Sequence, residues 1–211
     1  MTTRWIGLLG THGWPDDPSQ EWWHPRSAFA QFLARLDVVH ARPEKPFVWS
    51  GDVDGIPFLS GKDWEAGAEA FGYYAEDLPF ESRNVVAHSH GGQVALLAAA
   101  DGLRLRSLVM VGTPVRKDIE RVIATIAVRN IDRVLHISDA RWDWMGLAGA
   151  FFDFRVSFRR HFRVPGLETA RVRGIGHSGL LRDPRLFPLW LEHGWLRVLT
   201  GAAAAAPEER V

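Results

Sequence analysis

The sequence predicts an α/β fold, with a mostly parallel central sheet and helices on both of its faces. Short apolar runs bounded by glycine, proline and histidine alternate with longer stretches of helical character, which is the rhythm of β-α units. Several runs are apolar on both alternating faces, as in strands that helices cover on both sides. A chain of 211 residues that is 46% hydrophobic suits one substantial core. We therefore expect one domain over residues 1–200 and a disordered tail at 201–211.

The expected elements follow from these runs in chain order. Strands are predicted at Trp5–Leu9, Pro46–Ser50, Asn84–His88, Ser107–Val111, Arg133–Ser138 and Ala170–Arg173. Helices are predicted at Arg26–Leu36, Trp64–Leu78, Gly92–Ala100, Lys117–Val128 and Pro184–Leu199. In the first helix the large apolar residues share one face, so this helix is expected to pack on the sheet: Phe29, Phe32, Leu33 and Leu36.

Composition excludes several classes of function. Twenty-five basic residues balance 25 acidic ones, so nothing in the charge favours a nucleic-acid partner. The absence of cysteine excludes a thiolate nucleophile, a disulfide and a cysteine-based zinc site. The N-terminal apolar stretch is too short for a signal peptide, and no run is long enough to span a membrane, so we expect a cytoplasmic protein without a transmembrane segment.

Ser89 is the candidate nucleophile, because it lies where the strand Asn84–His88 meets the helix Gly92–Ala100. A tight strand-to-helix turn raises a serine hydroxyl at the edge of a sheet and directs the first N–H groups of the helix at a substrate oxygen. Ala87 and Gly91 are small enough to let such a turn close. The alternative is a serine that caps the helix. His88 and His90 also suggest a metal pair, but no third ligand cluster accompanies them, and we expect neither metal nor cofactor.

The run Ala87-His88-Ser89-His90-Gly91 resembles the G-x-S-x-G nucleophile elbow of the α/β-hydrolase superfamily, with alanine in place of the first glycine. Ile6 to Trp14 looks like the family's first core strand and its His-Gly turn. The resemblance implies an oxyanion hole formed by the N–H groups of His90 and Trp14, with His12 and Gly13 beside the substrate.

A later segment extends the resemblance. Gly112-Thr113-Pro114 is similar to a strand end of lipase-like and esterase-like members. The short distance from there to the strand at Arg133 implies that no cap domain is inserted.

In this family the acid and then the histidine follow the serine, which leaves His136, His161, His177 and His193 as candidate bases. His136 falls inside a strand, His161 among arginines, and His193 in an aromatic helix. His177 follows the last predicted strand on a glycine-rich loop, and it matches the family's histidine. We predict His177 as the base.

The acid has two candidates after the strand that ends at Ser138. Asp143, in Asp143-Trp144-Met145-Gly146, fits the family's arrangement better, and Asp139 comes so early that it is expected to cap a turn. We predict Asp143 as the acid, with Asp139 as the alternative.

The resemblance implies acyl transfer from a small, apolar carboxylic ester through an acyl-enzyme, with activity that falls in acid as the base becomes protonated. The ten tryptophans suggest an aromatic site that includes Trp144, or simply an aromatic core. Gly149–Arg163 is expected either to pack on the sheet or to touch lipid. An acyltransferase, a thioesterase, an amidase and a catalytically silent binding protein remain alternatives. The sequence does not predict an oligomeric state.

Overall fold

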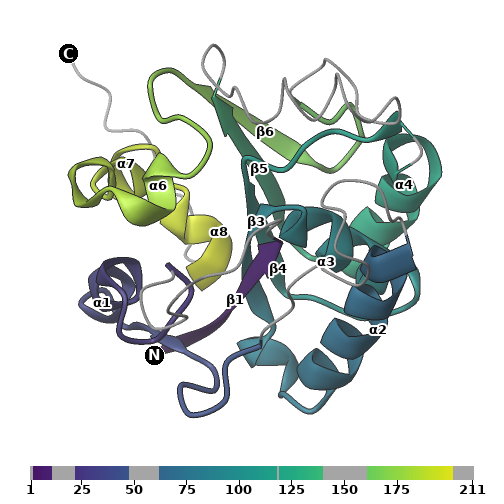
Figure 1. The fold of residues 1–211 in the computed structure, drawn as a ribbon, viewed down its shortest axis with the longest axis horizontal. Helices are drawn as coiled ribbons and strands as arrows, with labels where there is room; N and C mark the ends of the chain where they lie inside the picture. The colour runs from purple at the N-terminus through teal and green to yellow at the C-terminus, as the bar shows by residue number, and fades with distance from the viewer. Residues whose placement is uncertain (1, 11–21, 48–61, 118, 140–160, 202–211) are drawn as a thin grey trace.

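Six parallel strands in the order β2-β1-β3-β4-β5-β6 form the centre of the computed structural model, which describes residues 2–10, 22–47, 62–117, 119–139 and 161–201 (Figure 1). The strands are β1 (Thr3–Gly10), β2 (Val38–His40), β3 (Asn84–Ser89), β4 (Ser107–Val111), β5 (Val134–Asp139) and β6 (Glu168–Val172). This arrangement confirms the predicted α/β class with a parallel sheet.

The carboxyl ends of the middle strands meet at one edge of the sheet. Gly10 of β1 is in register with Ser89 of β3, and His88 is in register with Val111 of β4. On the next pair, Val111 is aligned with Ile137 of β5. Side chains and loops that follow these strand ends are therefore brought together at this edge, as in other open parallel sheets.

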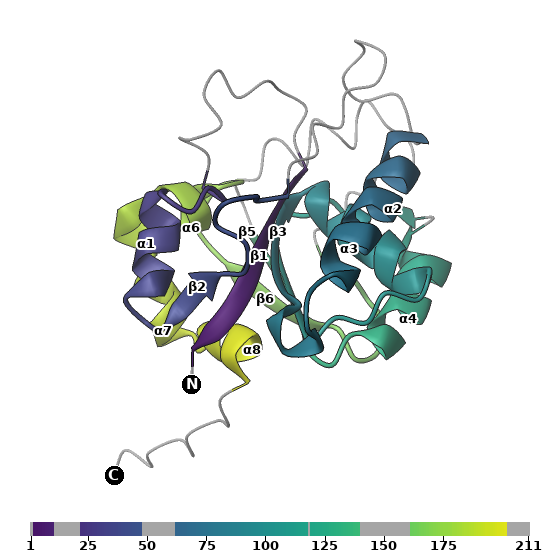
Figure 2. The same cartoon turned by 90° about the horizontal axis from the view of Figure 1, so that it is seen from below.

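Helices cover both faces of the sheet, as Figures 1 and 2 show from two directions. One face carries α2 (Lys62–Glu76), α3 (Gly91–Ala100) and α4 (Ala124–Ala127). The other face carries α1 (Ala28–Ala34), α6 (Gly179–Arg182), α7 (Leu189–Glu192) and α8 (Leu196–Thr200). None of the helices in the described part of the chain is long and apolar enough to cross a membrane.

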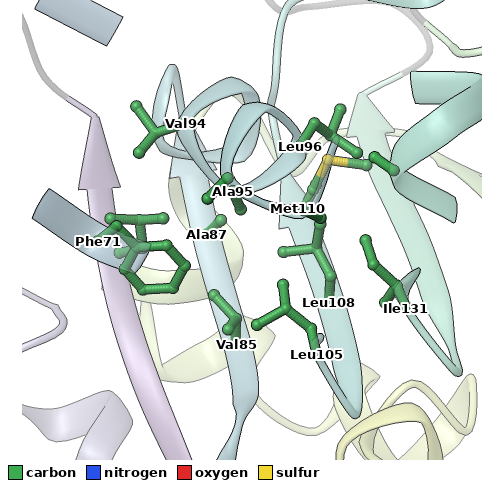
Figure 3. Close-up of a cluster of buried hydrophobic side chains, with 14 of the residues drawn as sticks. Phe71, Val85, Ala87, Val94, Ala95, Leu96, Leu105, Leu108, Met110 and Ile131 are labelled. Carbon is green, nitrogen blue, oxygen red and sulfur yellow. The ribbon is translucent and has the colours of Figure 1, made fainter. Parts of the chain in front are cut away.

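Alternate side chains of each central strand enter two different cores. Val85 and Ala87 of β3 pack in the core under α2 and α3, whereas Val86 packs in the core under α1 and α8. Figure 3 shows the first core, where Leu108 and Met110 of β4 lie beside the β3 side chains and below α3. Burial on both faces explains why these strands are continuous apolar runs.

One predicted strand is wrong in the part that the structure describes. Pro46 and Phe47 lie outside any strand, and residues 48–50 are outside the described residues. The strand beside β1 is instead β2, which has three residues and directly follows a turn at Asp37 with a φ of 57°. Phe47 contributes to the core, with its ring 5.3 Å from that of Phe71. Proline lacks the N–H that a strand ladder needs, and an apolar run can be buried without being a strand.

The predicted helix Pro184–Leu199 is divided into three pieces. A 3₁₀ turn at Pro184–Leu186 precedes α7, and Gly194, with a φ of 68°, separates α7 from α8. Pro188 at the start of α7 lacks the N–H of a continuous helix. The segment predicted at Lys117–Val128 is also irregular, with a π-helical turn at Ile119–Ile123 before α4 and a 3₁₀ turn at Val128–Asn130 after it.

The remaining elements lie close to their predicted positions. Helix α1 begins after Ser27, whose Oγ accepts a hydrogen bond from the N–H of Ala30 and donates one to the carbonyl of Trp22. β6 begins two residues before the predicted Ala170. Most of the tail expected at 201–211 lies outside the described residues.

Candidate functional site

Ser89 is the last residue of β3, and its backbone has a φ of 52°. An L-residue in this left-handed region costs about 1–2 kcal/mol relative to the right-handed one. The turn continues through His90 directly into α3, which begins at Gly91. Such strain is retained where the surrounding structure holds it, often at sites of function. A strained serine between a buried strand and a helix is the geometry that a nucleophile elbow requires.

The helix-cap alternative for Ser89 is not supported. The residue that caps the N-terminus of α3 is His90, and a capping serine adopts an extended backbone that differs from the left-handed one of Ser89. A cap would also give no reason for the strain.

The turn packs tightly on its neighbours. A Cβ on Gly92 would collide with the side chain of Thr113, which lies just beyond β4. The side-chain amide of Gln93 links the start of α3 to the segment after β4. Its oxygen accepts from His90 Nδ1 at 2.9 Å, and its nitrogen donates to the carbonyl of Pro114 at 2.9 Å. The resemblance to a Gly-Thr-Pro strand end thus falls on residues that hold the start of α3 in place.

His177 lies on the loop between β6 and α6, as the sequence predicts. Gly174 and Gly176 both have positive φ, and Ile175 between them is buried in the core. The His177 ring is half-buried, and its centroid is 4.8 Å from that of His88, the residue before Ser89. The loop therefore returns to the carboxyl end of β3.

The other candidate histidines are engaged elsewhere. His136 is fully buried in β5, where its Nε2–H donates to the carbonyl of Thr113 at 3.0 Å. His161 Nε2 accepts a hydrogen bond from Arg171 at 2.6 Å. His193 is exposed and stacks on Trp195, with ring centroids 4.7 Å apart. The choice of His177 over these three histidines stays a prediction.

Of the two candidate acids, the structure describes only Asp139. It ends β5, is 1% exposed, and its Oδ2 accepts the backbone N–H of Gly176 at 2.8 Å. Asp139 therefore binds a loop that is distant in sequence. Asp143, the predicted acid, lies outside the described residues.

Several other predicted site residues also lie outside the described residues: His12, Gly13, Trp14 and Trp144. The structure does show where the segment with the first three begins, because Gly10 is aligned with Ser89. Trp22 and Trp23, the next described residues, are both buried, and Trp22 packs on Trp5 and Phe29 in the core under α1. These two indoles are therefore part of the core.

The segment Gly149–Arg163 is described only from His161 onward. Phe162 in this part is buried, with its ring against His136, so this phenylalanine packs inside the protein. Among the residues described, no three histidines or carboxylates are grouped as metal ligands would be.

Contacts of His88 and Gly112 with His177 were not anticipated from the sequence. His88 is 4% exposed, and its Nε2–H donates to the carbonyl oxygen of His177 at 3.2 Å. Gly112 follows β4 with a φ of 62°, and a Cβ there would lie 3.1 Å from His177 Nδ1. A histidine before the serine and a glycine after a strand are weak signals on their own, because the contacts join residues far apart in the chain.

Comparison with solved structures shows other proteins with this fold. The chain aligns with a predicted CIB-like hydrolase from Thermoplasma acidophilum at 12% identity and a TM-score of 0.54, over 92% of this chain and 86% of that one. It aligns with a carboxylesterase structure from Nitrososphaera gargenis at 11% identity and a TM-score of 0.54, over 95% of this chain and 92% of that one. It also aligns with acyl-protein thioesterase 2 from Zea mays at 14% identity and a TM-score of 0.51, over 93% of this chain and 94% of that one.

The similarity is confined to the fold. No family model matches the sequence, and no curated protein matches it either.

Proposed function

Because the chain has the α/β-hydrolase fold, we propose that it is a serine hydrolase that cleaves a carboxylic ester through an acyl-enzyme. The observation that carries the proposal is the left-handed backbone of Ser89 at the turn from β3 into α3. A hydroxyl at that turn lies beside the N-terminal N–H groups of a buried helix, which favour negative charge. The position suits an attack on a carbonyl whose oxygen becomes an oxyanion.

In the proposed mechanism, Ser89 Oγ attacks the acyl carbon while His177 takes the hydroxyl proton. His177 then gives this proton to the leaving alcohol, and the acyl group remains on Ser89. A water molecule, deprotonated by His177, attacks the acyl carbon. The bond between Ser89 Oγ and the acyl group then breaks, His177 returns the proton to Ser89 Oγ, and the acid is released. Asp143 is the proposed partner of the imidazole and stabilises the imidazolium that forms at each step.

The N–H groups of His90 and Trp14 are the proposed oxyanion donors, and loss of one such donor costs about 3–4 kcal/mol in a comparable hydrolase. His12, Gly13 and Trp144 are the proposed residues beside the acyl group. The register of Gly10 with Ser89 supports this assignment for the segment after β1, because that segment starts next to the nucleophile.

Labelling with a fluorophosphonate tests the proposal, because the probe needs the nucleophile, the base and the oxyanion hole together. We expect covalent modification of Ser89 in the folded wild-type chain, located by mass spectrometry, and none of that site in Ser89→Ala. His177→Ala should abolish labelling, whereas His193→Ala, a change at an exposed stacked histidine, should leave it intact. Absence of labelling in the wild-type protein would favour a silent binding protein of the same fold.

A substrate panel then separates the leaving groups. Aryl esters of increasing acyl length, the matching thioesters and the matching anilides share one acyl group and differ only in the bond cleaved. We expect the highest kcat/KM for a small, apolar ester. A higher kcat/KM for thioesters than for esters would instead identify the protein as a thioesterase, an activity that the same triad supports.

A further inference from the structure

Gln93 is a fully buried polar side chain in the first turn of α3, 0% exposed. Its amide nitrogen donates to the carbonyl oxygen of Pro114 at 2.9 Å, and its amide oxygen lies 2.9 Å from His90 Nδ1. A buried amide costs free energy unless its ends are hydrogen-bonded, and here both ends are. The side chain therefore forms a bridge from the turn after Ser89 to the segment after β4.

The two hydrogen bonds of Gln93 determine which nitrogen of the His90 imidazole carries the proton. The carbonyl of Pro114 can only accept, so the amide nitrogen of Gln93 must face it. The amide oxygen then faces His90, and this oxygen also only accepts. His90 Nδ1 is therefore the donor, and the neutral imidazole has its proton on Nδ1 and a lone pair on Nε2.

His90 is held through both its backbone and its side chain. Its carbonyl oxygen accepts the N–H groups of Gln93 and Val94 in the first turn of α3. Its imidazole stacks on the indole of Trp64. A half-turn of the imidazole about its Cβ–Cγ bond preserves this stack, so the stack alone does not select one orientation of the ring. The hydrogen bond from Nδ1 to Gln93 does select one.

The other end of the bridge, Pro114, belongs to a segment that is itself fixed. The carbonyl of Thr113 accepts a hydrogen bond from a buried histidine of β5 at 3.0 Å. Gly112 lies against His177, since a Cβ there would be 2.6 Å from the His177 carbonyl oxygen. Gln93 therefore ties the turn that carries the candidate nucleophile to the segment on which the candidate base packs.

We propose that Gln93 is a positioning residue for the oxyanion side of the site, acting through the imidazole of His90. The inference rests on the proposed function, in which the N–H of His90 is an oxyanion donor. Gln93 holds the imidazole in one tautomer and one orientation, and so limits the motion of the residue whose N–H meets the developing charge. Oxyanion donors are effective because they are fixed before the reaction, so a small displacement slows the chemical step.

Replacement of Gln93 by methionine tests this role. Methionine has a similar length but makes neither hydrogen bond, so Gln93→Met should lower kcat by about 10- to 10²-fold, with a smaller change in KM. Gln31→Met is the matched control, because Gln31 lies exposed on α1, and it should behave as wild type. A wild-type kcat in Gln93→Met would overturn the proposal.

A double-mutant cycle shows whether Gln93 acts through His90. His90→Phe keeps a ring beside Trp64 and removes the nitrogen that Gln93 binds. Gln93→Met should therefore lower kcat by a much smaller factor in the His90→Phe background than in the wild-type one. The same loss in both backgrounds would overturn the proposal, because the two side chains would then act independently.

The tautomer of His90 provides a readout that needs neither activity nor a folded variant at residue 93. Nitrogen NMR shifts of the neutral imidazole, assigned by their absence from His90→Phe, should show a protonated Nδ1 and an unprotonated Nε2 in the wild-type chain. A proton on Nε2 instead would overturn the proposal. If the wild-type chain is not labelled by the fluorophosphonate, the proposed function fails, but the tautomer still decides whether Gln93 holds His90.

Discussion

The indole of Trp64 stacks on the imidazole of His90, with ring centroids 4.9 Å apart and planes inclined by 21°. The guanidinium carbon of Arg116 lies 4.0 Å from the centroid of the same indole. Trp64 and Arg116 are both buried, and they lie on α2 and in the segment after β4. Helix α2 therefore braces the turn that follows Ser89 through aromatic and cation–π contacts.

Loss of this stack should affect the chemical step more than substrate binding. We expect Trp64→Leu to lower kcat by about 10- to 10²-fold with little change in KM, because the His90 N–H is a proposed oxyanion donor whose position matters. Trp64→Phe, which keeps a ring, should retain most of the activity. Tyr73→Leu on the exposed side of the same helix is the control, and it should behave as wild type. A wild-type kcat in Trp64→Leu would show that the stack does not support the turn.

A pair of helical glycines should respond in opposite ways to alanine. A Cβ on Gly92 would meet the side chain of Thr113, whereas one on Gly72 in α2 would meet nothing within 4 Å. Gly92→Ala should therefore lower the free energy of unfolding by about 1–3 kcal/mol. Gly72→Ala should raise it by up to about 1 kcal/mol, because alanine favours helix. Urea denaturation measures both.

The double variant Gly92→Ala with Thr113→Ala tests the cause of that loss. Removal of the Thr113 side chain takes away the atoms that a Cβ at residue 92 would meet, so the double variant should recover most of the lost stability. Strictly additive free energies in the two single variants and the double variant would contradict the clash.

The sequence is a good guide to the central sheet because these strands are buried on both faces. β4 is apolar after Ser107, β3 has the apolar centre Val85-Val86-Ala87, and the predicted and observed bounds of both strands differ by at most one residue. β2 has only three residues, and its short run beside Asp37 carries no such pattern. The register of that edge strand depends on its pairing with β1, which local sequence does not encode.

For the candidate site, local pattern predicts the position of Ser89 but not the contacts around it. The junction of a buried strand and a helix of small residues is visible in the sequence. The hydrogen bond from Gly176 to Asp139 joins residues 37 positions apart, and the one from His88 to His177 joins residues 89 positions apart. Such contacts follow from the order of strands in the sheet, so the hydrogen bond between Asp139 and Gly176 became visible only with the fold.

His40 should make the protein less stable in mild acid. Burial lowers the pKa of this imidazole from 6.5 to about 4 in the folded chain, where its Nδ1 accepts the N–H of Arg42 and its ring packs on Trp5. The unfolded state therefore binds the proton more readily between these two values, so the stabilisation is complete above pH 6.5 and is lost as the pH falls toward 4. The loss at pH 4 should be at most about 3 kcal/mol.

Urea denaturation at pH 7 and at pH 4.5 measures this effect. His40→Asn keeps an acceptor for the Arg42 N–H and removes the titrating group, so its stability should change less between the two pH values than that of the wild-type chain. An equal change in the two proteins would assign the acid sensitivity to other groups.

The strained backbone of Ser89 predicts a conflict between stability and activity. Glycine adopts a φ of 52° without the cost that an L-residue incurs, which is about 1–2 kcal/mol, but it makes the unfolded chain more flexible. Ser89→Gly should therefore be more stable than Ser89→Ala by about 0.5–1 kcal/mol, and both should be inactive. Asp37→Gly, at the other described non-glycine residue with positive φ, should be stabilised similarly and stay active. If Ser89→Gly were no more stable than Ser89→Ala, the turn would not be strained. The backbone conformation of Ser89 would then no longer support its assignment as the nucleophile.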